Sequence, residues 1–172
     1  MRRLLDIRII RWELKLLYVI GAIGVGFVLA GLLRAWGMQE TVAMLTTSTF
    51  HVAALLLGAR LFRGSGEAIE PPRPWWRMTA RPTLSRRLGI LFAVLAAFGV
   101  VANVLTAVGE YTPTPGVSLG EAVFGSMIGV LEFTTIAYLY LNSAVRLKRI
   151  GVPPKAAKLP KPPKFRPTVK LR

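Results

Sequence analysis

The chain has 172 residues, of which 53% are hydrophobic and 18% are charged, and its formal net charge is +15. This length suits a single domain, and the absence of cysteine excludes disulfides, thiolate metal sites and a thiol nucleophile. The positive charge alone would fit nucleic-acid binding, but the basic residues flank long apolar segments, as they do in membrane proteins.

Four apolar stretches dominate the chain, at residues 16–33, 41–59, 88–109 and 122–145. They contain one carboxylate, Glu132, and one histidine, His51, but no lysine or arginine. A helix needs about 20 apolar residues to cross a hydrocarbon layer of about 30 Å, and each stretch is close to that length. The sequence therefore predicts an all-α integral membrane protein. Its four-transmembrane-helix bundle would occupy residues 1–150, and residues 151–172 would form a separate tail.

The segment before the first stretch, residues 2–15, mixes apolar and basic side chains. Its apolar residues recur at spacings of three and four, which indicates a helix. We expect either an interfacial helix or a cytoplasmic extension of the first span. Within that span, Ala22, Gly26 and Ala30 form a stripe of small residues, which predicts a helix-packing face.

The second span carries His51 on a helical face that it shares with Met44, Ser48 and Gly58. Small and polar side chains on one face of a membrane helix favour a position inside the bundle. We therefore expect His51 to point toward another helix of the chain.

The connection at residues 60–87 contains four prolines and seven arginines, so it cannot form one continuous helix. Its most distinctive feature is the pair Trp75 and Trp76, which stands between Arg73 and Arg77. One interpretation is an aromatic anchor at the lipid headgroups, with the arginines bound to lipid phosphates. The alternative is a docking surface for a partner subunit.

Two helix starts are marked by residues with capping side chains. Thr83 is the expected N-cap of the third span, and Ser118 is the expected N-cap of the fourth, with Glu121 completing a capping box. Gly99 and Asn103 lie on a small-residue face of the third span, where we expect helix packing and an interhelical hydrogen bond from Asn103.

The fourth span has Glu132 near its middle, on the same face as Gly125 and Gly129. A carboxylate at that depth is costly against lipid, and the two glycines allow another helix to approach closely. We expect Glu132 to form an intramembrane polar pair with His51. The pair would either set the register of two helices or serve in a proton path or a quinone site.

The tail at residues 151–172 is rich in proline and lysine and has no acidic residue. Such a segment buries little apolar area, so we expect an extended chain that binds an acidic protein surface or anionic lipid headgroups, with nucleic acid as a less favoured partner. The basic residues expected to make these contacts are Lys155, Lys158, Lys161, Lys164, Arg166 and Lys170.

The charges predict a topology. The N-terminal segment, the 60–87 connection and the tail are basic, whereas the connections at 34–40 and 110–121 together hold one arginine and three glutamates. The bias of basic loops toward the cytoplasm places both termini there, in the cytoplasmic membrane of a prokaryote. One glutamine and two asparagines are typical of thermophile usage, although a GC-rich genome produces much of the same bias.

The sequence contains no phosphate loop, metal-ligand cluster or nucleophile–base set. We therefore expect no enzymatic activity, no metal and no cofactor held by this chain alone, although lipid should bind. Haem or quinone at an interface shared with another subunit is a less favoured alternative. A haem would need Met44 or Met127 as its second axial ligand, because the chain has a single histidine, His51.

These features favour a non-catalytic accessory subunit of a larger hetero-oligomeric membrane complex, of a respiratory or otherwise energy-transducing kind. The first alternative is a small oligomeric transporter or channel that uses Glu132 and His51. The second alternative is a membrane-anchored adaptor whose tail binds lipid or nucleic acid.

Overall fold

The computed structural model describes residues 8–64, 67, 73–109 and 118–151. These residues form four helices and no strand, apart from one isolated bridge. The helices are α1 (Trp12–Ala35), α2 (Glu40–Leu61), α3 (Pro82–Ala107) and α4 (Leu119–Arg149). Each is long and apolar enough to cross a membrane, which is consistent with a membrane protein and confirms the prediction of four membrane-length helices.

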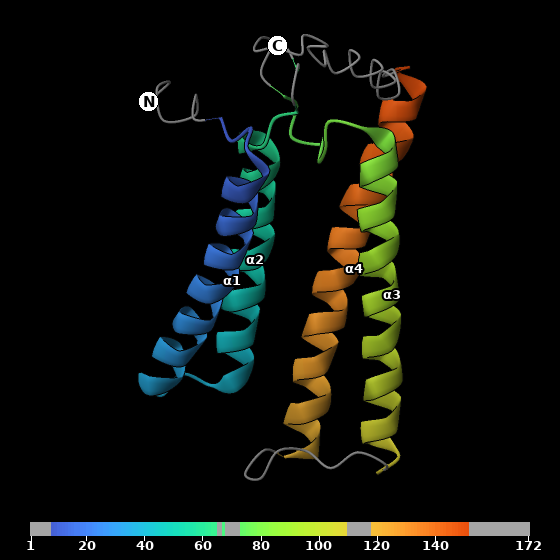
Figure 1. Ribbon diagram of the computed structural model, residues 1–172. Helices are drawn as coiled ribbons and strands as arrows, with labels where there is room; N and C mark the ends of the chain where they lie inside the picture. Colours follow the sequence, from blue (N-terminus) through green and yellow to red (C-terminus); the bar gives the residue numbers. More distant parts are fainter. Residues whose placement is uncertain (1–7, 65–66, 68–72, 110–117, 152–172) are drawn as a thin grey trace, which may run out of the picture.

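The helices form two antiparallel hairpins, α1 with α2 and α3 with α4 (Figure 1). The closest packing joins α3 to α4, and the hairpins meet through α2 and α4. The start of α1, the end of α2, the start of α3 and the end of α4 lie at the same end of the bundle. We call this the linker end, because the segment that joins α2 to α3 lies there.

Small residues allow α3 and α4 to approach closely. A Cβ atom at Gly89 would lie 2.7 Å from Cγ of Leu141, and one at Gly99 would lie 2.7 Å from Cγ2 of Val130. Between the same helices, the buried Ser85 hydroxyl donates a hydrogen bond to the backbone oxygen of Tyr140 at 2.9 Å. Glycine and serine thus have the role that they have in other membrane helix pairs.

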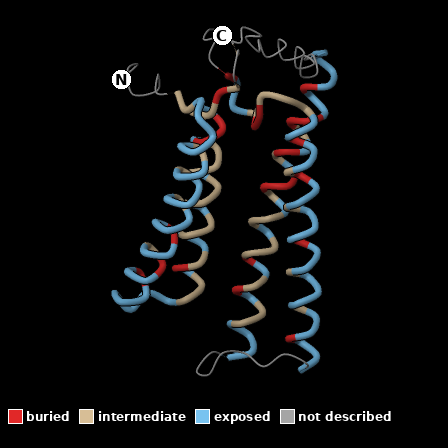
Figure 2. The backbone as a smooth tube through the Cα atoms, in the orientation of Figure 1, coloured by how far each residue is buried: buried red, intermediate tan, exposed pale blue. Residues whose placement is uncertain are grey.

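The outer surface of the bundle is strongly apolar. Figure 2 shows exposed residues along most of α1 and α3, and they include Phe27 and Phe98, which are 74% and 66% exposed. Continuous apolar surface of this extent is rare on proteins surrounded by water alone. It suits helices whose outer faces are solvated by lipid, with every backbone hydrogen bond made inside the helix.

Two predictions about helix starts have different outcomes. The Ser118 capping box is confirmed: its hydroxyl accepts from the Glu121 backbone N–H at 3.3 Å, and Glu121 Oε2 accepts from the Ser118 backbone N–H at 3.0 Å. The prediction that Thr83 caps the third span is wrong, because α3 begins at Pro82 and its N-cap is Arg81. Proline suits the first helical position, since it needs no hydrogen-bond acceptor there and its φ is already helical.

The described part of the N-terminal segment divides at Trp12, where α1 begins. Residues 12–15 extend the first span, and residues 8–11 are not helical. Instead, the Ile9 backbone N–H donates to the Leu61 oxygen at 2.9 Å, and the Ile9 oxygen accepts from the Arg63 N–H at 3.1 Å. The chain before α1 is therefore joined to the end of α2, whereas residues 2–7 lie outside the described residues.

Candidate functional site

A cluster of three polar side chains joins the middle of α2 to the middle of α4. Glu132 Oε2 accepts a hydrogen bond from the Ser48 hydroxyl at 2.6 Å, and Glu132 Oε1 lies 3.2 Å from His51 Nδ1. The Glu132 side chain is 14% exposed and that of His51 is 25% exposed. The structure thus brings the two residues of the expected pair into contact, and Ser48 occupies the second carboxylate oxygen.

The second ring nitrogen of His51 is buried and, among the described residues, has no hydrogen-bond partner. It lies against α1 at Gly26, where a Cβ atom would be only 2.0 Å from His51 Nε2. Only glycine leaves room for the imidazole at this point. His51 Nε2 is therefore the unpaired polar atom of this cluster, and the backbone of α1 covers this atom.

An apolar pocket of about 400 Å³ lies between the two hairpins, beside this cluster. Its lining comes from all four helices, the linker end and the polar pair itself. The pocket residues are Tyr18, Val19, Ala22, Ile23, His51, Ala54, Leu55, Gly58, Ala59, Phe62, Met78, Phe92, Glu132, Phe133, Ile136 and Tyr140. A few polar atoms in a mainly apolar wall are the usual composition of a small-molecule site.

Aromatic rings form much of the pocket wall. Phe92 stacks on Tyr140 with a centroid distance of 5.9 Å and an interplanar angle of 2°, and it lies 6.0 Å from the Phe133 ring. On the opposite side, the Tyr18 hydroxyl donates to the Ala54 backbone oxygen at 2.7 Å. The Tyr18 ring thus faces the pocket while its hydroxyl is already bonded.

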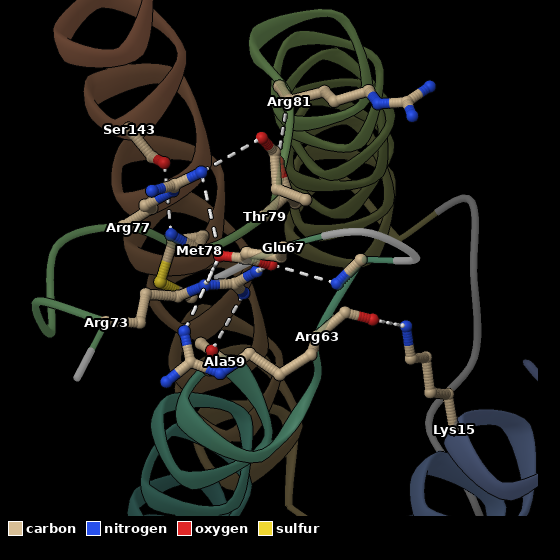
Figure 3. A network of polar contacts seen from close by, with 12 residues as sticks. Lys15, Ala59, Arg63, Glu67, Arg73, Arg77, Met78, Thr79, Arg81 and Ser143 are labelled. Atoms are coloured by element: carbon tan, nitrogen blue, oxygen red, sulfur yellow. Dashed lines mark hydrogen bonds and ion pairs between the residues drawn. The ribbon is translucent and has the colours of Figure 1, made fainter. Parts of the chain in front are cut away.

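A second polar network lies at the linker end and has Glu67 at its centre (Figure 3). Arg73 Nε donates to Glu67 Oε1 at 3.1 Å, and Arg73 Nη2 pairs with Oε2. Arg63 and Arg77 approach Oε1 at 3.5 Å and 3.6 Å. Arg73 also donates to the Ala59 backbone oxygen at 3.0 Å, which ties the linker to the last turn of α2.

Electrostatics at this network favour an ionised Glu67. Burial alone would raise the pKa of Glu67. However, hydrogen bonds from the Arg73 guanidinium and the Gly64 backbone N–H, together with the charges of Arg73 and Arg77, hold that pKa below its ordinary value. One carboxylate thus faces three guanidinium groups, and the Nε atoms of Arg63 and Arg77 are buried without a described partner.

The four residues predicted at a docking surface have different environments. Arg73 is 3% exposed, and Arg77 faces Glu67, so both are engaged inside the chain. The Arg146 guanidinium lies 5.6 Å from the centroid of the Trp76 ring, a cation–π contact with α4. Trp75 is 62% exposed and is the one of the four that projects freely.

The predicted packing residues are mostly engaged inside the bundle. Ala30 is buried, and Ala22 and Gly26 face the pocket and His51, as described above. A Cβ atom at Gly125 would lie 2.6 Å from Met44 Sδ, so this glycine admits α2. Gly129 has no described atom within 4 Å of its Cβ position.

The roles expected for Asn103 and Met127 find no partner among the described residues. Asn103 Oδ1 is buried and has no hydrogen-bond partner among the described residues. Met127 is 56% exposed, and the other methionine considered as a haem ligand, Met44, packs against Gly125. The basic tail residues from Lys155 onward lie outside the described residues.

Two features of the site were not found from the sequence. Glu67 lies among the seven arginines of the 60–87 connection, which it shares with one other acid, Glu70, and an acid so outnumbered by arginines is a signal for an internal ion pair. The glycines at positions 21, 24 and 31 were not distinguished from the packing stripe that begins at Ala22. Within the described part of the chain, no group of three or more His, Cys, Asp or Glu side chains could hold a metal ion.

Comparison of this chain with protein-family models, with curated proteins and with solved structures finds no match.

Proposed function

We propose that this chain is a non-catalytic accessory subunit of a larger membrane protein complex and binds its neighbours through the outer face of α1. The observation that supports this most directly is a second glycine face on α1, formed by Gly21, Gly24 and Gly31. These residues are exposed, and no described atom lies within 4 Å of their Cβ positions. They share one side of the helix, separate from Gly26.

Glycine at a lipid-facing helix position lowers helix stability and gains no packing contact in return. It destabilises a helix interior by about 1 kcal/mol relative to alanine, and lipid gains nothing from its small size. Glycine is useful where a second helix approaches the backbone closely. Three glycines on one open face of α1 therefore favour a partner helix from another subunit.

The proposed orientation puts the linker end in the cytoplasm, with both termini on that side. Basic side chains concentrate at this end, as the positive-inside bias requires. At the opposite end, Arg34 pairs with Glu40 through an Nε–Oε2 contact of 2.7 Å, so the basic residue of that connection is neutralised.

Among possible parent complexes we favour a respiratory or otherwise energy-transducing one. A histidine–carboxylate pair within a membrane helix bundle is costly, and ionisable side chains at that depth mark proton relays and substrate or ion pathways in membrane proteins. His51 and Glu132 form the pair on which this narrower assignment depends.

The same pair is the observation that favours the alternative, a small transporter or channel. Conduction requires polar groups or water that continue from one end of the bundle to the other. In the described part of α1–α4, His51 and Glu132 instead border an apolar pocket. We therefore favour the accessory role over transport, and also over the adaptor whose tail lies outside the described residues.

Co-migration in mild detergent tests the proposal. The native chain should migrate on native gels with other membrane subunits, and Gly24→Leu should release it as a free subunit because the larger side chain blocks a close helix approach. Ala97→Leu is the matched control, since Ala97 is an exposed small residue on α3 outside the glycine face. Migration of the native chain as a lone monomer, or equal effects of the two variants, would contradict the proposal.

A further inference from the structure

The pocket beside His51 and Glu132 is lined by residues from all four helices of this chain. Its volume of about 400 Å³ falls within the range of about 300–1,000 Å³ that is usual for small-molecule sites. Its polar atoms are concentrated where α2 faces α4 halfway along the bundle. A ligand that fills it must therefore be mostly apolar and must have a polar group at one end.

The pocket walls favour a flat ring over a flexible chain. Phe92 and Phe133 lie on the α3–α4 side, and the Tyr18 ring lies on the α1–α2 side. Aromatic faces pack well against a planar ring in offset or edge-on arrangements. The Tyr18 hydroxyl is bonded to the Ala54 oxygen. Both carboxylate oxygens of the polar pair are engaged as well, so the imidazole Nε2 is the position of the polar cluster left for a ligand.

The pocket is bordered by both outer helices of the bundle. The closely packed helix pairs are α1–α2, α2–α4 and α3–α4, so α1 and α3 are the two outer members of the row. Both contribute pocket residues, Val19 from α1 and Phe92 from α3 among them. A membrane-dissolved ligand would then enter between α1 and α3.

We propose that this pocket binds the ring of an isoprenoid quinone, with a ring oxygen at His51 and the isoprenoid chain leaving between α1 and α3. His51 Nδ1 is engaged with Glu132, so Nε2 is the free hydrogen-bonding position of the imidazole. In one tautomer Nε2 accepts a hydrogen bond, and in the other it donates one. When Nδ1 donates to Glu132, Nε2 accepts from the hydroxyl of a quinol. When Glu132 carries the proton and donates it to Nδ1, Nε2–H donates to the carbonyl of a quinone.

A small movement of α1 is part of this binding. Nε2 lies against Gly26, so the ligand oxygen reaches it when α1 moves outward. Of the other helices, α1 packs closely on α2 alone, which makes it the element with the least to lose in such a shift. Ligand binding would select this slightly opened arrangement.

A lipid acyl chain fits the same pocket less well. An acyl chain would place methylene or methyl groups against His51 and Glu132, which leaves the buried imidazole Nε2 without a hydrogen-bond partner. A ring with a polar oxygen supplies that partner.

Binding of decylubiquinone to the purified, delipidated full chain in detergent tests the inference, with decylbenzene as a tail-matched ligand that has no ring oxygen. Isothermal titration should show about tenfold tighter binding of decylubiquinone, the difference expected from one satisfied buried hydrogen bond. His51→Phe and Glu132→Gln should remove this preference. Thr49→Val is the control on α2, because Thr49 is an exposed residue whose hydroxyl bonds its own helix.

A second pair of variants, designed to fill the pocket, tests the inference if His51→Phe or Glu132→Gln fails to fold. Ala54→Phe should abolish binding of both ligands, whereas Ala53→Phe, on the exposed side of the same helix, should not. Equal affinity for the two ligands, or a preference that survives His51→Phe and Glu132→Gln, would overturn the inference and indicate an acyl-chain groove. Because this experiment uses the chain without other subunits, a negative result would not bear on the proposed accessory role.

Discussion

Gly26 shows how one missing side chain shapes the centre of this bundle. His51 reaches across from α2, and its Nε2 occupies the space where a Cβ atom at Gly26 would lie. The imidazole can then face Glu132 with its other nitrogen. At the residue scale, the polar cluster depends as much on the glycine behind it as on the charged groups within it.

Gly26→Ala should destabilise the bundle by about 1–3 kcal/mol, because the new methyl group overlaps the imidazole and forces α1 or His51 to move. Gly129→Ala is the matched control, since no described atom lies within 4 Å of that Cβ position and alanine favours a helix. Thermal unfolding in detergent, followed by circular dichroism, measures both. Equal midpoints for the two variants would argue against close packing at His51.

The linker between α2 and α3 is held by an ion-pair network and by Met78, which is buried in an apolar cluster with residues of α2 and α4. Glu67 pairs with Arg73, which is 3% exposed and also bonds the Ala59 oxygen at the end of α2. Nearby, the Met78 backbone N–H donates to the Ser143 hydroxyl of α4 at 3.0 Å. At the scale of elements, these contacts fix the linker to both hairpins.

Glu67→Gln should reduce stability by about 2 kcal/mol at neutral pH, because it removes the negative charge that faces three guanidinium groups. The pKa of Glu67 is lower in the folded chain than in the unfolded one. Its stabilisation is therefore complete above the ordinary carboxyl pKa of about 4.3 and is lost as pH falls through the folded value.

The measurement is the difference in unfolding midpoint between the native chain and Glu67→Gln from pH 7 down to pH 3. This difference should shrink as the pH falls. Glu13→Gln, which changes an exposed carboxylate near the start of α1, is the control and should have little effect. A constant difference across the range would show that the Glu67 charge is not the cause.

At the scale of the whole molecule, two hairpins place four helix ends on one side, and the basic linker marks that side (Figure 1). Because the chain has no cysteine, single cysteines can report the side of the membrane without a background. Trp75→Cys and Ile150→Cys replace exposed residues at the linker end, and Ala35→Cys replaces one at the opposite end.

Labelling with a membrane-impermeant maleimide should distinguish the two ends. We expect positions 75 and 150 to react from the cytoplasmic side only, and position 35 to react from the other side only. The unsubstituted chain is the blank. Reaction of positions 75 and 150 from opposite sides would contradict an even number of crossings between them.

Local chemistry explains which predictions were accurate. Crossing a hydrocarbon layer requires about 20 consecutive apolar residues, so the four helices could be found by length and composition alone. The capping box at Ser118 is equally local, because its partner Glu121 is three residues away. Thr83 was misassigned because two adjacent residues, proline and threonine, both fit a helix start and only the backbone decides between them.

The sequence by itself determined the apolar length of each helix and the charge of each connection, because both are properties of contiguous residues. Only the tertiary structure decided the contacts of the site. His51 and Glu132 are 81 positions apart, and whether they meet depends on how α2 and α4 rotate and align. The burial of Arg73 likewise depends on how the linker folds back onto α2, since a guanidinium becomes an internal residue only where a carboxylate such as Glu67 is placed against it.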